Sequence, residues 1–223
     1  MVNKNWNLSG LILEGVCGTG KTSILRAILR SKAYIQKPYF SSLVLSEHQT
    51  QRVLESKERQ GTLTISDNVA LLEGHVAYLE KLRDRLDEMD WCDKNLTAMR
   101  IPYLVERFHF THVGHYAHVD WEDVAALDKR LAQLSCKLCL FTIDDAVLEQ
   151  RVIHDRSAGW RDYVKRFGST NAEIIRHYSE QQRLMVDLCR KSALEIRLID
   201  TSHRTLADTV AEVLAFWGAL EPE

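Results

Sequence analysis

Five short apolar runs recur along the chain, separated by longer stretches with helical spacing. The runs cover residues 11–14, 41–46, 103–106, 138–143 and 196–200. Apolar runs of this length that alternate with amphipathic helices are typical of parallel strands whose sheet is covered on both faces. The pattern therefore predicts an α/β fold, a three-layer α/β/α sandwich around a five-stranded parallel sheet.

Three of the intervening stretches have a clear helical pattern. Residues 22–30 follow the first run, and residues 124–134 follow two N-cap candidates, Asp120 and Asp123. The longest helix is expected over residues 66–89, where one apolar stripe consists of Val69, Leu72, Val76, Leu79, Leu82 and Leu86. This stripe fits either the core of the same chain or the seam of a homodimer, and the charged opposite face is expected to meet water.

The length and composition indicate one globular domain over residues 1–223. Its arginine-rich stretch at about 150–170, with "SAG" and "FGST" as breaks, is expected to form a mobile lid. A net charge of -2 offers no surface for nucleic acid, and no apolar run is long enough to mark a membrane span. The polar N-terminal segment does not have the apolar core of a signal peptide, so a cytoplasmic location is expected.

The first apolar run leads into "GVCGTGKT", which completes the pattern G-x-x-x-x-G-K-[ST] between a strand and a helix. Glycines let the backbone curl so that successive N–H groups point inward, and the following helix adds partial positive charge. Lys21 is expected to reach the β- and γ-phosphates of a nucleoside triphosphate, and the Thr22 hydroxyl to bind Mg²⁺. The expected nucleotide-binding residues are Gly15, Val16, Cys17, Gly18, Thr19, Gly20, Lys21, Thr22 and Ser23.

The same loop serves kinases, GTPases and mechanochemical ATPases, so other residues must distinguish between these classes. The D-x-x-G and N-K-x-D segments expected of a GTPase do not occur in the chain. A mechanochemical ATPase would usually end an internal strand with paired Asp-Glu. The nearest candidate, "LFTIDD" ending at Asp145, comes late in the chain.

The third strand ends in "LVERFHFTHVGHY", and here the chain resembles the thymidylate kinase and deoxynucleoside kinase group of P-loop phosphotransferases. At this place thymidylate kinases have Asp-Arg-Tyr, followed after two residues by Ser. This chain has Glu106, Arg107 and Phe108, followed after two residues by Thr111. Deoxynucleoside kinases have Glu-Arg-Ser here, so Glu106 and Arg107 match them more closely. The resemblance implies an ATP- and Mg²⁺-dependent kinase with strand order 2-3-1-4-5. It places Glu106 near Mg²⁺ and Arg107 over the transferred phosphoryl group.

Two further segments extend the resemblance over most of the chain. "LCLFTIDDAVLEQRVIHDR" is similar to the fourth strand, short helix and lid of these kinases. This similarity implies that Arg151 and Arg156 close on ATP, with Arg161 and Arg166 as weaker candidates. "IRLIDTSHRTLADTVAEVLAFW" resembles their last strand, loop and helix, and implies that this loop passes beside the adenine.

The acceptor side departs from the thymidylate kinase pattern. After the second strand thymidylate kinases have Arg-Glu-Pro-Gly-Gly-Thr, whereas this chain has "VLSEHQTQR", in which only Glu47 matches. In the long helix, His75 stands where those kinases have an arginine. Deoxynucleoside kinases use a glutamate after the second strand as the base for a hydroxyl, which implies that role for Glu47. We expect a nucleoside, a nucleotide or a similar small molecule as acceptor. A kinase for a non-nucleotide alcohol and an ATP-binding regulator with slow hydrolysis are the alternatives.

Two regular patterns have the spacing of metal ligands but lack further ligands to complete a site. Histidines recur every third residue, at His109, His112, His115 and His118. Steps of three residues drift by about 60° on an α-helix, so the four cannot share a face. We expect His112 or His115 to face the acceptor pocket. Cys136 and Cys139 lie three apart in a strand, and we expect them to face opposite sides and pack in the core.

Overall fold

The computed structural model of the chain describes residues 8–36, 41–88 and 101–218. The strands are β1 (Leu8–Glu14), β2 (Leu43–Leu45), β3 (Ile101–Glu106), β4 (Cys136–Thr142) and β5 (Glu195–Asp200). The longer helices are α1 (Lys21–Arg30), α5 (Ile65–Glu88), α7 (Trp121–Gln133), α10 (Asn171–Leu188) and α11 (Leu206–Trp217). The shorter helical segments are α2 (Lys32–Ile35), α3 (Glu47–Thr50), η1 (Arg52–Leu54), α4 (Glu55–Arg59), α6 (His109–His115), α8 (Asp145–Glu149), η3 (Gln150–His154), α9 (Ala158–Val164) and η4 (Lys165–Phe167).

The five strands form one parallel sheet in the order β2-β3-β1-β4-β5, which confirms the predicted order and layer type. Leu13 of β1 pairs with Glu106 of β3, and Glu14 of β1 pairs with Leu140 of β4. The carboxyl ends of these three central strands therefore meet at one edge of the sheet. Ligands of open parallel sheets bind at this edge.

The second strand is shorter than the predicted residues 41–46. Leu43–Leu45 alone pairs with β3. Ser42 instead shares a hydrogen bond with the Tyr34 hydroxyl (2.6 Å), and Ser46 is the N-cap of α3. The serines at both ends of this run are used by turns and helix caps, so the strand keeps only its three apolar residues.

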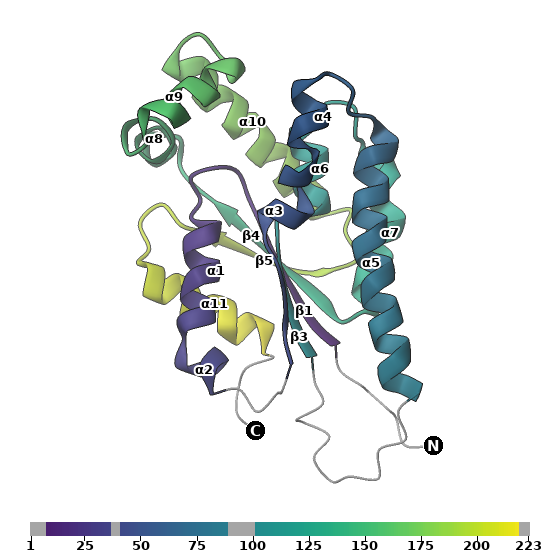
Figure 1. The fold of residues 1–223 in the computed structure, drawn as a ribbon. Helices are drawn as coiled ribbons and strands as arrows, with labels where there is room; N and C mark the ends of the chain where they lie inside the picture. Colours follow the sequence, from purple (N-terminus) through teal and green to yellow (C-terminus); the bar gives the residue numbers. More distant parts are fainter. Residues whose placement is uncertain (1–7, 37–40, 89–100, 219–223) are drawn as a thin grey trace.

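Helices cover both faces of the sheet, and each face has its own apolar core. Figure 1 shows α1 and α11 on one face and α5, α7 and α10 on the other. Cys136 belongs to the core under α5 and α7, and Cys139 to the core under α1 and α11, which confirms that they face opposite sides. Burial raises the pKa of the Cys136 thiol to about 12, so this cysteine stays protonated at neutral pH.

The apolar stripe of the long helix packs inside its own chain. Leu72, Val76 and Leu79 of α5 are at most 1% exposed, and they belong to the same core as α7. The helix begins one residue before the predicted 66–89, and Met89, its predicted last residue, lies outside the described residues. Of the two uses expected for this stripe, the structure shows the intramolecular one.

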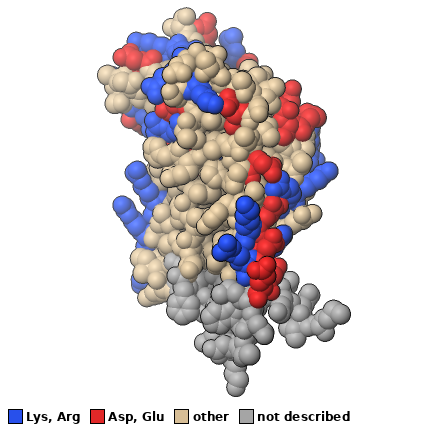
Figure 2. All heavy atoms as spheres, turned by 45° about the vertical axis from the view of Figure 1, so that its right-hand side comes forward, with Lys and Arg blue, Asp and Glu red and all other residues tan. Residues whose placement is uncertain are grey.

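The charged face of α5 is on the outside of the molecule. Figure 2 shows acidic and basic side chains intermixed along this side rather than a patch of one sign. Arg130 of α7 reaches across to α5 and donates hydrogen bonds to Glu73 (2.6 Å) and Glu80 (2.6 Å). Within the described parts of the chain, no helix has the length and apolar character needed to cross a bilayer.

The arginine-rich stretch at 150–170 folds into a π-helical turn (η3), a short α-helix (α9) and a 3₁₀ turn (η4). The predicted break at "SAG" falls at the start of α9. Ser157 lies between η3 and α9 as the N-cap of α9, where its hydroxyl accepts a hydrogen bond from the Trp160 N–H (3.4 Å), and Ala158 and Gly159 belong to the helix. The "FGST" segment does separate η4 from α10.

Candidate functional site

The glycine-rich loop joins the buried strand β1 to the amphipathic helix α1. Gly15, Gly18 and Gly20 have φ angles of 136°, 87° and 86°, which residues with a Cβ rarely adopt. A Cβ on Gly15 would also lie 2.5 Å from the Phe141 carbonyl oxygen, too close for any side chain. The loop therefore needs glycine at these positions to make its turn at the carboxyl edge of the sheet.

Lys21 is enclosed by this loop. Its Nζ donates hydrogen bonds to the carbonyl oxygens of Gly15 (2.5 Å) and Val16 (2.7 Å), and the residue is 4% exposed. Burial, and after it the Arg107 charge, lower the pKa of Lys21 to about 7, although nearby acids such as Glu106 oppose the shift. A bound anion would favour the charged form of this amine and raise its pKa again.

Thr22 and Glu106 place two oxygen ligands beside the loop. The Thr22 hydroxyl donates to Glu106 Oε1 (2.6 Å), although the two residues are 84 positions apart in the sequence. Glu106 is 1% exposed, and in the described part of the chain no basic side chain lies at ion-pair distance from it. Hard oxygen ligands and a buried, unpaired carboxylate fit a Mg²⁺ ion that would also bind phosphate oxygens and water.

Arg107 has an unusual backbone conformation at the end of β3. Its φ is 57°, in the left-handed region that costs a non-glycine residue about 1–3 kcal/mol. The backbone N–H of Arg107 donates to the Leu13 carbonyl (3.1 Å), and its Nε donates to Glu47 Oε2 (2.9 Å). Glu47 lies at the start of α3, so the two candidate residues form one ion pair over the end of the sheet.

Glu14 is a buried carboxylate that the motifs of the sequence do not single out. It is fully buried at the end of β1 and accepts hydrogen bonds from the Phe108 N–H (2.8 Å), the Thr111 N–H (3.2 Å) and the Thr111 hydroxyl. Thr50, likewise not predicted, donates to the Glu106 carbonyl (2.6 Å). Both residues hold the backbone around Glu106 and Arg107 rather than facing open space.

A first hollow, of about 460 Å³, lies over the glycine-rich loop on the side of α11. Arg151 lines this hollow, and its guanidinium donates hydrogen bonds to the carbonyls of Thr201 (2.8 Å) and Ser202 (3.2 Å) in the loop after β5. The Arg156 Nε donates to the Arg151 carbonyl (2.9 Å). Other lining residues are Gly18, Thr19, Gly20, Ser23, Ile24, Asp155, Arg204, Leu206 and Thr209.

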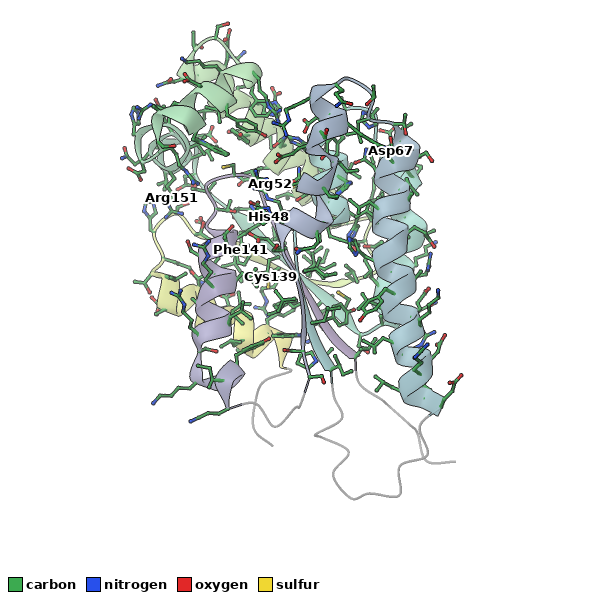
Figure 3. All side chains as sticks on the ribbon, viewed as in Figure 1. His48, Arg52, Asp67, Cys139, Phe141 and Arg151 are labelled. Atoms are coloured by element: carbon green, nitrogen blue, oxygen red, sulfur yellow. The ribbon has the colours of Figure 1, made fainter. Side chains whose placement is uncertain are left out.

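A second cavity, of about 550 Å³, lies on the other side of the loop. In Figure 3, Arg151 lies on one side of the loop between β1 and α1, and Arg52 of η1 lies on the other. The walls of the cavity come from α3, η1, α4, α6, α9, η4 and α10. They include Val16, Cys17, Glu47, Arg52, Glu55, Glu58, Arg107, His115, Trp160, Tyr163, Arg166, Phe167, Tyr178 and Gln181.

The arginines of the second cavity are paired with its glutamates. Arg52 donates to Glu55 (2.5 Å), and Arg166 lies 3.4 Å from Glu58. His115 Nε2 is 3.3 Å from Glu58, and its hydrogen bond is the main cause that lowers the pKa of this carboxyl group. Because each of these acids already faces a cation, the walls are polar without a large excess of one charge.

The four regularly spaced histidines have different surroundings. His115 lines the second cavity, but His112 does not: its ring nitrogens face the Asn68 side chain (2.8 Å) and the Thr50 carbonyl (2.8 Å). His109 faces Asp128 (2.9 Å), and His118 faces Asn68 (3.1 Å). Among residues 8–36, 41–88 and 101–218, no three His, Cys, Asp or Glu side chains are placed to share a metal ion.

The predicted residues thus divide between the two sides of the loop. Lys21, Thr22 and Glu106 come together at the carboxyl edge of the sheet, Arg151 and Arg156 line the first hollow, and Glu47, Arg107 and Arg166 line the second cavity. Lys21, Thr22 and Glu106 line neither space, and the same is true of His75 and Arg161. The His75 ring faces the Gln49 carbonyl (3.2 Å), and the Arg161 guanidinium donates to the Arg156 carbonyl (2.9 Å).

Comparison with known proteins adds information on the fold. No family model and no curated protein sequence matches this chain. Among solved structures, the chain is similar to the YorR protein of Bacillus subtilis, determined in complex with phosphorylated GDP, with a TM-score of 0.54 and 14% sequence identity over 92% of this chain and 94% of that one. This likeness supports the α/β fold described above, and the resemblance to thymidylate and deoxynucleoside kinases stays a prediction.

Proposed function

We propose that the protein is an ATP- and Mg²⁺-dependent phosphotransferase that acts on a nucleoside, a nucleotide or a similar small acceptor. The observation that carries this proposal is the pair of spaces that meet at the glycine-rich loop. Val16 and Cys17 line the larger cavity, and the next residues, Gly18 to Gly20, line the smaller hollow. A transferase needs both a donor and an acceptor site next to the transferred group, whereas a nucleotide switch needs the donor site alone.

On the donor side, the loop would bind the phosphates of ATP. Its backbone N–H groups and Lys21 would hold the phosphate chain, and Thr22 and Glu106 would hold Mg²⁺, which neutralises charge on the phosphate oxygens. Arg151 and the loop after β5 would bind next to the nucleoside part of ATP. YorR has a similar fold and was determined with a nucleotide, which supports a nucleotide site in this chain too.

On the acceptor side, Glu47 and Arg107 lie together at the cavity wall. The carboxylate of Glu47 would accept the proton of an attacking hydroxyl, and the guanidinium of Arg107 would stabilise charge on the phosphoryl group. Four arginines of this cavity already pair with glutamates, so a second phosphate would have to displace those carboxylates. This arrangement favours an acceptor hydroxyl over an acceptor phosphate.

The stretch at 150–170 would act as the lid of the single domain. Arg151 and Arg156 line the donor hollow, while Trp160, Tyr163 and Arg166 line the acceptor cavity. One short segment therefore contacts both proposed sites. Closure of such a segment excludes water that would otherwise hydrolyse ATP.

The test is ADP release from ATP and Mg²⁺ with a panel of nucleosides, nucleoside monophosphates and small non-nucleotide alcohols. Lys21→Ala, purified in the same way, supplies the background for contaminating ATPases. We expect one hydroxyl acceptor to raise ADP release in the wild type alone, with a phosphorylated product visible by mass spectrometry. A panel without any stimulation, combined with tight ATP binding, would overturn the proposal in favour of an ATP-binding regulator.

A further inference from the structure

The backbone of Arg107 is strained, and the contacts that hold it come from β1. Its N–H donates to the Leu13 carbonyl (3.1 Å), and the next N–H, that of Phe108, donates to the Glu14 carboxylate (2.8 Å). Two consecutive residues of β1 thus bind two consecutive residues after β3. The left-handed conformation of Arg107 lies between these two contacts.

Glu14 takes only neutral donors, all from one short stretch. It accepts from Phe108 N–H and from both the N–H and the hydroxyl of Thr111, in the first turn of α6. Among the described residues, no basic side chain forms an ion pair with this fully buried carboxylate. All hydrogen-bond partners of Glu14 are in this turn. Because a buried carboxylate and its donors hold each other strongly, Glu14 fixes the backbone conformation of the turn.

We propose that Glu14 is the positioning residue for Arg107: it holds the turn 107–111 so that the guanidinium lines the second cavity and meets Glu47. Without the Glu14 carboxylate, the Phe108 and Thr111 N–H groups are buried without an acceptor. The turn then relaxes towards an ordinary backbone conformation, and the guanidinium moves. The kinetic consequence rests on the proposed phosphotransferase function, whereas the placement of Arg107 does not.

The same turn offers a matched control on its other side. Asp128 is an equally buried carboxylate that accepts from the His109 ring (2.9 Å), the Ser192 hydroxyl (2.6 Å) and the Ala193 N–H (2.6 Å). Asp128 belongs to α7 and binds the His109 side chain of α6, but none of its partners is in the backbone of residues 106–108. Asp128→Asn is therefore expected to lower the melting temperature without changing the placement of Arg107.

The first test is kinetic and uses Glu14→Leu, which keeps a similar size but removes both acceptor oxygens. We expect kcat to fall by about 10- to 100-fold, because a misplacement of about 1 Å can cost about 100-fold, while the ATP dissociation constant stays the same. In an Arg107→Ala background the same substitution should have no further effect on kcat. An equal loss in both backgrounds, or an Asp128→Asn variant with the same kcat loss as Glu14→Leu, would overturn the proposal.

The second test does not need turnover. The ¹⁵N NMR signal of the Arg107 Nε–H, assigned by its loss in Arg107→Lys, reports the bond to Glu47. We expect this signal to shift or broaden in Glu14→Leu and to stay unchanged in Asp128→Asn; an unchanged signal in Glu14→Leu would overturn the proposal. If Glu14→Leu does not fold, Thr111→Val, which removes one of the three donors, should move the signal in the same direction by a smaller amount. A wild type without kinase activity would contradict the proposed function and leave this second test intact.

Discussion

The two sides of the glycine-rich loop are built in different ways. The proposed donor side begins with nine consecutive residues, Gly15 to Ser23, which follow one strand and open one helix. The proposed acceptor cavity has walls from seven short or distant elements, from α3 to α10. The part of a site that one continuous segment forms can therefore be recognised from its spacing, while the parts that many segments form become visible only when the chain is folded.

The largest effect is expected on the donor side. Lys21→Ala should lower turnover by about 1000-fold, because a preorganised charge at the phosphoryl group is removed. The fold should be retained, since Lys21 contacts mainly the carbonyl oxygens of its own loop. Turnover and thermal unfolding are measured on the same preparation, and normal turnover by the folded variant would contradict the site assignment.

A large effect confined to the acceptor side is expected for Glu47. Glu47→Gln should lower kcat by about 100-fold with a hydroxyl acceptor, because the proton of the attacking group then has no base, and ATP affinity should not change. Glu80→Gln is the matched control, since Glu80 also binds an arginine (Arg130, 2.6 Å) but lies between α5 and α7. If the acceptor group is a phosphate and the Glu47→Gln variant has an unchanged kcat with it, the cavity receives a nucleotide instead.

A pH titration should separate the two sides further. The pKa of Lys21 is lowered to about 7, so the amine loses its proton as pH rises above 7, and ATP affinity should fall by up to about tenfold per pH unit between pH 7 and 9. The unfolded chain keeps this proton up to about pH 10.5, so the stability contributed by this group rises over the same window. Calorimetry in buffers of different ionisation enthalpy should detect proton uptake on ATP binding. Binding without proton uptake would contradict the assignment, and Lys21→Ala is the control.

The smallest effects are expected from two arginines of the same lid stretch. Arg151→Ala should weaken ATP binding by about tenfold, because its charge-assisted bonds hold the loop after β5. Arg166→Ala should raise the acceptor KM by about fivefold at most, since its partner Glu58 is partly exposed. Titrations of each substrate against both variants decide this. If both arginines affected the same substrate, the division of the lid between two sites would be wrong.

Several structural details could not be predicted because they depend on contacts between distant segments. Glu14 precedes the recognisable loop and looks like the last residue of a buried strand, and its role depends on donors 94 and 97 positions away. His112 and His115 have the same spacing and residue type, yet one packs against Asn68 and Thr50 while the other lines the cavity. Helical geometry shows that they cannot all share a face, but not which face meets which neighbour.

The strand pattern and the position of the glycine-rich loop follow from the amino-acid sequence, because they depend on residues that are close along the chain. The order of the strands came from the resemblance instead. The residue types at the end of β3 likewise point to Glu106 and Arg107. The orientation of Arg107, the pairing of acids with arginines and the place of the second cavity arise in the folded chain. They do so because parallel strands need long crossovers, which bring residues far apart in the sequence to one edge of the sheet.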